Sequence, residues 1–165
     1  MTSALNVVPE TSEISTGVRD TEAMAQGLEN MLADTYRLIF KTHAVHWNVE
    51  GPMFFAVHNL TEEQYEDMFK AADEIAERIR SLGQLAPSSL SSIVSNSVIQ
   101  DNDEALSAGE MCQDLAADHE RVAHRLHALI RIADEHGDPV TEDMAVGRAT
   151  FHEKAAWMLR AVSKS

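Results

Sequence analysis

The chain has 165 residues, 44% of them hydrophobic and 24% charged, which describes one globular domain and leaves little room for a second. Thirteen Lys and Arg against 27 Asp and Glu give a formal net charge of −14. Such a field repels nucleic acid and anionic membranes and attracts cations, unless it serves only to keep the protein soluble. The single cysteine, Cys112, excludes an internal disulfide framework and cysteine-based zinc knuckles.

The first residues of the chain predict a flexible tail. Residues 1–20 are polar and carry no periodic apolar stripe, so we expect a single domain over residues 21–165. The start has no basic segment followed by an apolar stretch, and we therefore expect no signal peptide. No apolar run approaches the roughly 18–20 residues that a membrane span needs. The cytoplasm is the expected compartment.

Two long helices are predicted in the first half of the chain. Apolar residues recur with helical spacing from Met24 to His46, and Gly51 with Pro52 ends this helix. A second helix is expected over residues 54–82, stopping at Gly83. Its expected apolar stripe consists of Phe54, Val57, Tyr65, Phe69, Ala72, Ala76 and Ile79.

The second half predicts two more long helices after an irregular connection. Residues 84–106 are rich in serine and are too long for a tight turn, so we expect one short helix within them. Ser107 and Glu110 form a capping-box sequence for a helix that runs to about His136 and ends at Gly137.

The last helix is expected to follow a chain break at Asp138 and Pro139. Thr141 is the expected N-cap of this helix, and Trp157 is expected to pack in the core. Four long helices joined by short, long and short connections predict an all-α, ferritin-like four-helix bundle with a short extra helix in the long connection. This architecture alone does not settle function, because bundles also serve as cytokines, haem proteins and scaffolds.

Histidines and carboxylates gather in the second helix and just before it. His58 with Glu62, and Asp73 with Glu77, are each four residues apart, which places both members of a pair on one helix face. Imidazole and carboxylate together suit iron, manganese and zinc. The pattern predicts a metal site.

The spacing of these pairs indicates how such a site is assembled. Glu62 and Asp73 fall within about 20° of the same helix face but lie roughly 16 Å apart along the axis. If both pairs serve one site, they must come from two antiparallel copies of the helix related by a two-fold axis. None of the eight histidines follows a glutamate by three residues, which excludes the Glu-x-x-His plan of intrasubunit di-iron bundles.

The segment Tyr36–Gly83, with THAVHWNVEGPMFFAVHNLTEEQYEDMFKAADEIAERIRSLG, resembles the signature region of the Dps family, the starvation-induced mini-ferritins. The resemblance continues more loosely after Ser107 and through HEKAAWMLR. It implies a dodecameric shell with ferroxidase sites between subunits, in agreement with the two-fold argument.

Matching the motifs position by position, the resemblance implies that iron binds at His46, His58, Glu62, Asp73 and Glu77. Glu77 would bridge two metal ions, and Trp47, beside the site, would take part in catalysis by absorbing stray oxidising equivalents. Position 62 is Asp in several relatives, so Glu62 shifts the carboxylate by one methylene. His43 either contacts a second, weaker iron or only forms a hydrogen bond.

The function that the resemblance implies is oxidation of Fe(II) by hydrogen peroxide or O2, two ions per site, with storage of the ferric mineral. DNA compaction, for which the family is named, and passive buffering of zinc or iron are the alternatives. Before Thr21 the chain has no lysine and one arginine, Arg19. This argues against direct DNA binding and leaves nucleoid association only as an alternative location.

Further polar residues have two interpretations each. A second metal site or a hydrated outer face would explain Asp118, His119, Glu120, His124 and His127. A solvated face or the lining of a storage cavity would explain Glu63, Glu66, Asp67 and Glu74. Candidates for an iron-entry pore are Glu142 and Asp143.

Overall fold

The computed structural model describes residues 8–12 and 14–164. It contains five helices and, within those residues, no β-strand. The helices are α1 (Thr21–Asn48), α2 (Phe54–Ser81), α3 (Leu90–Asn96), α4 (Ala108–His136) and α5 (Pro139–Val162). The predicted all-α bundle with one short extra helix is confirmed, whereas the predicted division at residue 20 stays a prediction.

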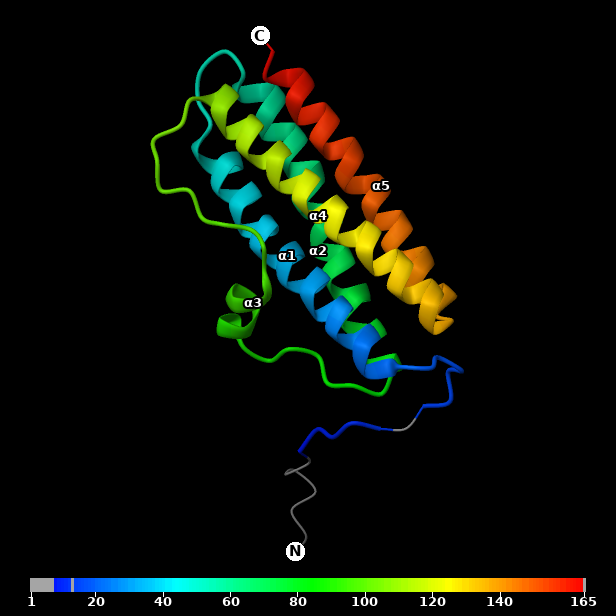
Figure 1. The fold of residues 1–165 in the computed structure, drawn as a ribbon. Helices are drawn as coiled ribbons and strands as arrows, with labels where there is room; N and C mark the ends of the chain where they lie inside the picture. Colours follow the sequence, from blue (N-terminus) through cyan, green and yellow to red (C-terminus); the bar gives the residue numbers. More distant parts are fainter. Residues whose placement is uncertain (1–7, 13, 165) are drawn as a thin grey trace, which may run out of the picture.

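The four long helices form two antiparallel hairpins, α1 with α2 and α4 with α5, that pack against each other (Figure 1). The long connection from α2 to α4 runs along the bundle and places α3 against α1. One end of the bundle therefore carries the α1–α2 turn, the start of α4 and the end of α5 (Figure 1). The other end carries the N-terminal segment and the α4–α5 turn.

Aliphatic side chains and methionines fill the bundle interior. The predicted stripe of α1 is confirmed, with Met24, Leu28 and Leu38 fully buried. Three expectations were wrong, because these side chains lie on outward faces of their helices: Trp157 is 66% exposed, Phe69 is 58% exposed and Phe54 is 44% exposed. None of the described helices combines the length and the apolarity that crossing a membrane requires.

The ends of α4 and α5 show how local sequence sets helix boundaries. The capping box of α4 is confirmed, with the Glu110 carboxylate accepting from the Ser107 backbone N–H at 2.8 Å. The predicted cap of α5 was wrong, because Asp138 is the N-cap and its carboxylate accepts from the Thr141 N–H at 2.9 Å. Pro139 occupies the first helical position, where no backbone N–H is needed.

A buried ion pair fastens the long connection to the bundle. Arg125 on α4 binds the fully buried Asp34 of α1 at 3.0 Å. The same carboxylate accepts from the Ser97 hydroxyl and the Val98 N–H, and Arg125 also donates to the Asn96 carbonyl. Through the Asp34 carboxylate and its partner Arg125, α1 and α4 are therefore joined to residues 96–98 of the connection.

We expect Asp34→Ala to lower the free energy of unfolding by about 3 kcal/mol or more, because it leaves a partly buried guanidinium and a backbone N–H without their acceptor. Asp101→Ala is the matched control, since its ion pair with Arg37 is exposed and such pairs contribute less than about 1 kcal/mol. Chemical denaturation of both variants measures the difference. Equal losses would show that the Asp34 cluster does not fasten the connection.

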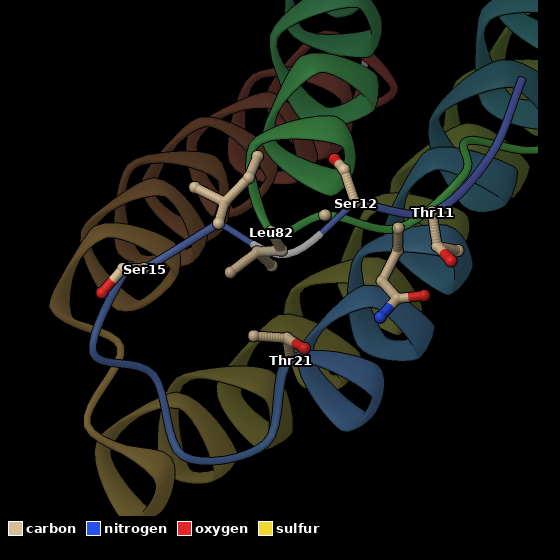
Figure 2. A pocket seen from close by; sticks show the side chains of 8 residues that line it. Thr11, Ser12, Ser15, Thr21 and Leu82 are labelled. Carbon is tan, nitrogen blue, oxygen red and sulfur yellow. The ribbon is translucent and has the colours of Figure 1, made fainter.

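The described N-terminal residues cross the end of the bundle (Figure 2). The Ser12 N–H donates to the Gly83 carbonyl at 2.8 Å, and the Arg19 N–H donates to the His136 carbonyl at 3.1 Å. Gly83 has φ +86°, and a Cβ there would lie 2.0 Å from the Ser12 carbonyl oxygen, so only glycine fits. A cleft of about 590 Å³ lies between this segment and the end of α2, far from the histidines of the α1–α2 turn.

Two histidines pair inside the bundle. His119 of α4 and His152 of α5 are both buried, and their Nδ1 atoms lie 2.8 Å apart. One ring therefore donates through Nδ1–H and the other accepts, so the accepting ring is neutral. Burial, and next to it the charge of Arg148, lowers the pKa of His119 to about 3, and burial lowers the pKa of His152 well below its usual range.

The free energy of unfolding should therefore decrease as the pH is lowered, at pH values above those at which carboxylates titrate. In the unfolded chain both histidines bind protons near pH 6.5, so below that pH the unfolded state binds more protons than the folded state. Between about pH 6.5 and 5 the free energy of unfolding should fall by up to about 1.4 kcal/mol per pH unit for each buried histidine. Denaturant midpoints across this range measure the slope.

His119→Gln should reduce this pH dependence, whereas substitution of the exposed His124 by Gln should leave it unchanged. A wild-type midpoint that does not move between these pH values would contradict the neutral buried pair.

Candidate metal centre

His46 and His58 meet at the α1–α2 turn. Their rings stack with centroids 3.7 Å apart. The Nδ1–H of His46 donates to the His58 carbonyl at 2.9 Å, and the Nδ1–H of His58 donates to the His46 carbonyl at 3.0 Å. Because a carbonyl can only accept, each ring carries a proton on Nδ1, and the atom left for a metal ion is Nε2.

The chain folds this way because the carbonyl of His46 lies in the last turn of α1, where backbone acceptors lack partners within the helix. Gly51, with φ +87°, turns the chain so that α2 returns alongside. The imidazole of His58 then supplies the missing donor. The buried Thr61 hydroxyl donates to the Val57 carbonyl at 2.7 Å. Its oxygen also lies 3.4 Å from Nδ1 of His46 and so contacts that ring.

Glu62 lies one turn after His58 and its side chain is exposed. The hydroxyl of Tyr65 donates to the Glu62 carboxylate at 3.5 Å. The ring of Tyr65 lies 3.9 Å from that of His43 and meets His46 edge-on at 5.2 Å. The sequence predicts Tyr65 only as part of the apolar stripe of α2, although its position three residues after Glu62 was a usable signal.

Trp47 is 62% exposed and stacks on His43, with ring centroids 5.1 Å apart. His43 is therefore held between Trp47 and Tyr65, and burial, with the neighbouring His46, lowers its pKa. This favours a neutral ring, and both interpretations of His43 stay open.

Asp73 and Glu77 lie further along α2, and both are exposed. Because α2 is an unbroken helix, they remain roughly 16 Å or more from Glu62 along its axis. Across residues 8–12 and 14–164, no three His, Cys, Asp or Glu side chains converge where one ion could bind them. The structure brings His46 and His58 together and leaves Asp73 and Glu77 apart from them.

Exposed aromatic side chains surround these residues. On α2, Phe55 is 76% exposed and shares a face with Glu62, Phe69 and Asp73, to within about 20° of Glu62. On α1, Phe40 and Trp47 form an edge-to-face pair with centroids 6.5 Å apart. Several large aromatic side chains exposed on one side of a protein favour an interaction site there.

The polar residues of α4 that were considered as a second metal site fall into a buried group and a group that faces solvent. Asp118 is buried and binds Lys41 at 2.5 Å and also Arg121, and His119 is buried too, so a hydrated outer face is wrong at these two positions. His119 pairs with His152, as described above. The remaining members lie toward solvent, where they form the pairs His127–Glu153 at 2.9 Å and Glu120–Arg160 at 2.6 Å.

The other carboxylates of α2, Glu63, Glu66, Asp67 and Glu74, are exposed. Asp67 accepts from Arg148 of α5 at 2.6 Å, so it helps to join the hairpins. Asp143 is exposed and Glu142 half-buried at the start of α5.

Comparison with known proteins agrees with this geometry. A family model described as a ferritin-like domain matches residues 25–164. DNA protection during starvation protein 2 of Bacillus anthracis is 36% identical over 134 residues, which cover 81% of this chain and 92% of that protein. Dps from Staphylococcus aureus has a TM-score of 0.85 and 30% identity, and the match covers 89% of this chain and 99% of that one.

Dps from Vibrio cholerae O1, described as a member of a broad superfamily of ferritin-like diiron-carboxylate proteins, has a TM-score of 0.80 and 29% identity. That match covers 86% of this chain and 89% of the other. The fold is thus that of the ferritin-like proteins. Within them, the chain belongs to the Dps family.

Proposed function

We propose that this protein is a ferroxidase that oxidises Fe(II) with hydrogen peroxide, or with O2, and stores the ferric mineral inside a dodecameric shell. It would thereby protect the cell from oxidative damage. The observation that carries the proposal is the His46–His58 pair, in which both Nδ1 protons are bound to backbone carbonyls and both Nε2 atoms remain for metal. Membership of the Dps family supports the same conclusion.

The proposed site combines residues of two copies. One copy provides His46, His58 and Glu62, and a second copy, antiparallel about a two-fold axis, provides Asp73 and Glu77. The separation of the two sets along α2 supports this arrangement, because no single chain can close it. The exposed aromatic side chains on the same face supply apolar surface for the contact.

Each ligand type fits the substrate. Neutral imidazole nitrogen and carboxylate oxygen suit Fe(II) and Fe(III), and Glu77 would bridge two ions. Two Fe(II) supply both electrons in the balanced reaction 2 Fe(II) + H2O2 + 2 H⁺ → 2 Fe(III) + 2 H2O. Paired oxidation avoids the hydroxyl radical that a single Fe(II) would release. Trp47 would give up an electron to oxidising equivalents that escape the pair.

The charge distribution supports delivery and storage of iron. The net charge of −14 attracts Fe(II) toward the shell. Glu142 and Asp143, near the start of α5, are the proposed pore residues. Carboxylates on α2 such as Glu66 and Glu74 are proposed to meet the growing mineral. The proposed location is the cytoplasm.

Loss of a ligand should slow oxidation while the shell still assembles. We expect Glu77→Ala and His46→Ala to reduce the rate at least about 10-fold, the lower range of effects for residues that orient or bind a metal. Glu135→Ala, which removes an exposed carboxylate near the end of α4, is the control and should keep the rate. The measurement is ferric absorbance after anaerobic Fe(II) loading and addition of H2O2 or O2, with light scattering to confirm assembly.

This experiment also separates the proposal from passive metal buffering. A buffer would bind Fe(II) tightly but would not accelerate its oxidation over free Fe(II). Unchanged rates in both ligand variants would remove these residues from the site, and a stable monomer with tight iron binding would contradict the shared site.

Direct DNA binding is the other candidate, and the charge argues against it. In a shell, the net charge of each chain would add to a field that repels duplex DNA wherever salt does not screen it. We expect no mobility shift of plasmid at about 0.1 M salt and neutral pH with a chelator present. DNA should still be protected from Fe(II) and H2O2 because the protein removes both reagents. A shift whose salt dependence reports several phosphate contacts would show a basic patch formed by assembly.

A further inference from the structure

Six buried side-chain atoms lack a hydrogen-bond partner within the described part of the chain, and they are distributed over all four long helices. They are Oγ1 of Thr42, Nε2 and Oε1 of Gln64, Nε2 of His119, and Nε and Nη2 of Arg148. Buried polar atoms in folded proteins are nearly always bonded to protein or to ordered water. Their concentration in one bundle interior points to a bound polar species.

Contacts across the helices place three of these side chains around one ring. The guanidinium of Arg148 lies 4.2 Å from the centroid of Phe151, and the ring of His119 lies 6.0 Å from the same centroid. Gln64 and Phe151 line one crevice between α2 and α5. Nη1 of Arg148 donates to Asp67, one turn after Gln64. Gln64, His119 and Arg148 therefore converge.

The fourth side chain lies at the same level. Lys41, next to Thr42 on α1, binds Asp118 at 2.5 Å, and Asp118 precedes His119 on α4. Each long helix thus contributes one polar group to a single layer across the bundle.

A cation does not fit this layer. The positive charge of Arg148 contributes, after burial, to the lowered pKa of His119, and the same charge would repel a metal ion. An anion does not fit well either, because the Asp67 carboxylate already neutralises Arg148, and a further buried negative charge would stay uncompensated.

A neutral molecule that both donates and accepts does fit. The Nε–Nη2 edge of Arg148 offers only donors, and the amide of Gln64 offers a donor and an acceptor. Nε2 of His119 is a donor or an acceptor, depending on the tautomer. A buried water needs two to four such partners.

We propose that ordered water occupies this layer and bridges Gln64, His119 and the Nε–Nη2 edge of Arg148. The two hairpins are then joined in their interior through water as well as through apolar contact. A fully bonded polar layer of this kind rigidifies a core and fixes how its elements align. The site is separate from the proposed iron site, because Gln64 projects roughly 160° away from Glu62 around α2.

A high-resolution crystal structure of the full chain in its assembled form tests the proposal. We expect water density within about 3.2 Å of at least two of the three side chains. A second crystal, soaked in bromide, identifies an anion by its anomalous signal. Bromide in the layer, or a layer without density, would overturn the proposal.

The direction in which Gln64→Leu changes Tm gives an independent test. If water bridges the layer, leucine removes one partner of the water, and Tm should fall by roughly 3 °C or more. If the Gln64 amide is unsolvated, leucine removes a desolvation cost and Tm should rise. Gln113→Leu, at an exposed position of α4, is the matched control. A Tm that rises, or that matches the control, would overturn the proposal, and the wild-type crystal structure decides if the variant does not fold.

Discussion

The unbroken course of α2 is the constraint on which the candidate site depends. Its 28 residues contain neither proline nor glycine, so nothing kinks the helix, and each residue adds about 1.5 Å. Glu62 and Asp73 therefore share a face without being able to share an ion within one chain. The same face exposes Phe55 and Phe69, so the surface that would need a second copy to complete the proposed site also offers that copy apolar area to bury.

The other half of the site depends on the end of α1. A helix end leaves carbonyls without partners, and here the imidazole of His58 satisfies the carbonyl of His46. The reciprocal bond from His46 runs to the carbonyl of His58, near the start of α2. One pair of hydrogen bonds thus closes the turn, stacks the rings and fixes the Nδ1–H tautomer that metal binding through Nε2 requires.

Most of the fold could be predicted because it is local. Periodicity located the helices, and the Ser107–Glu110 pair located a helix start. The cap of α5 was misplaced because Asp138 precedes Pro139, a pair that breaks a helix and equally well begins one. The faces that meet in space could not be predicted, since one sequence does not say which distant positions pack together. The contacts missed for this reason are His119 with His152, Asp118 with Lys41, and Tyr65 with His43.

The ligands of the proposed site also come from distant positions, so one sequence does not show that they meet. Their like charges affect the energy of the proposed assembly. Three carboxylates, Glu62, Asp73 and Glu77, would meet across an interface between chains that each carry a charge of −14. Like charges oppose that contact, so the aromatic surface must supply the association, at about 25 cal/mol for each Å² of apolar area buried. Two Fe(II) bring four positive charges to the three carboxylates and remove the local repulsion. Apolar contact would therefore build the shell, and the charged residues that weaken it would be retained because they bind the substrate.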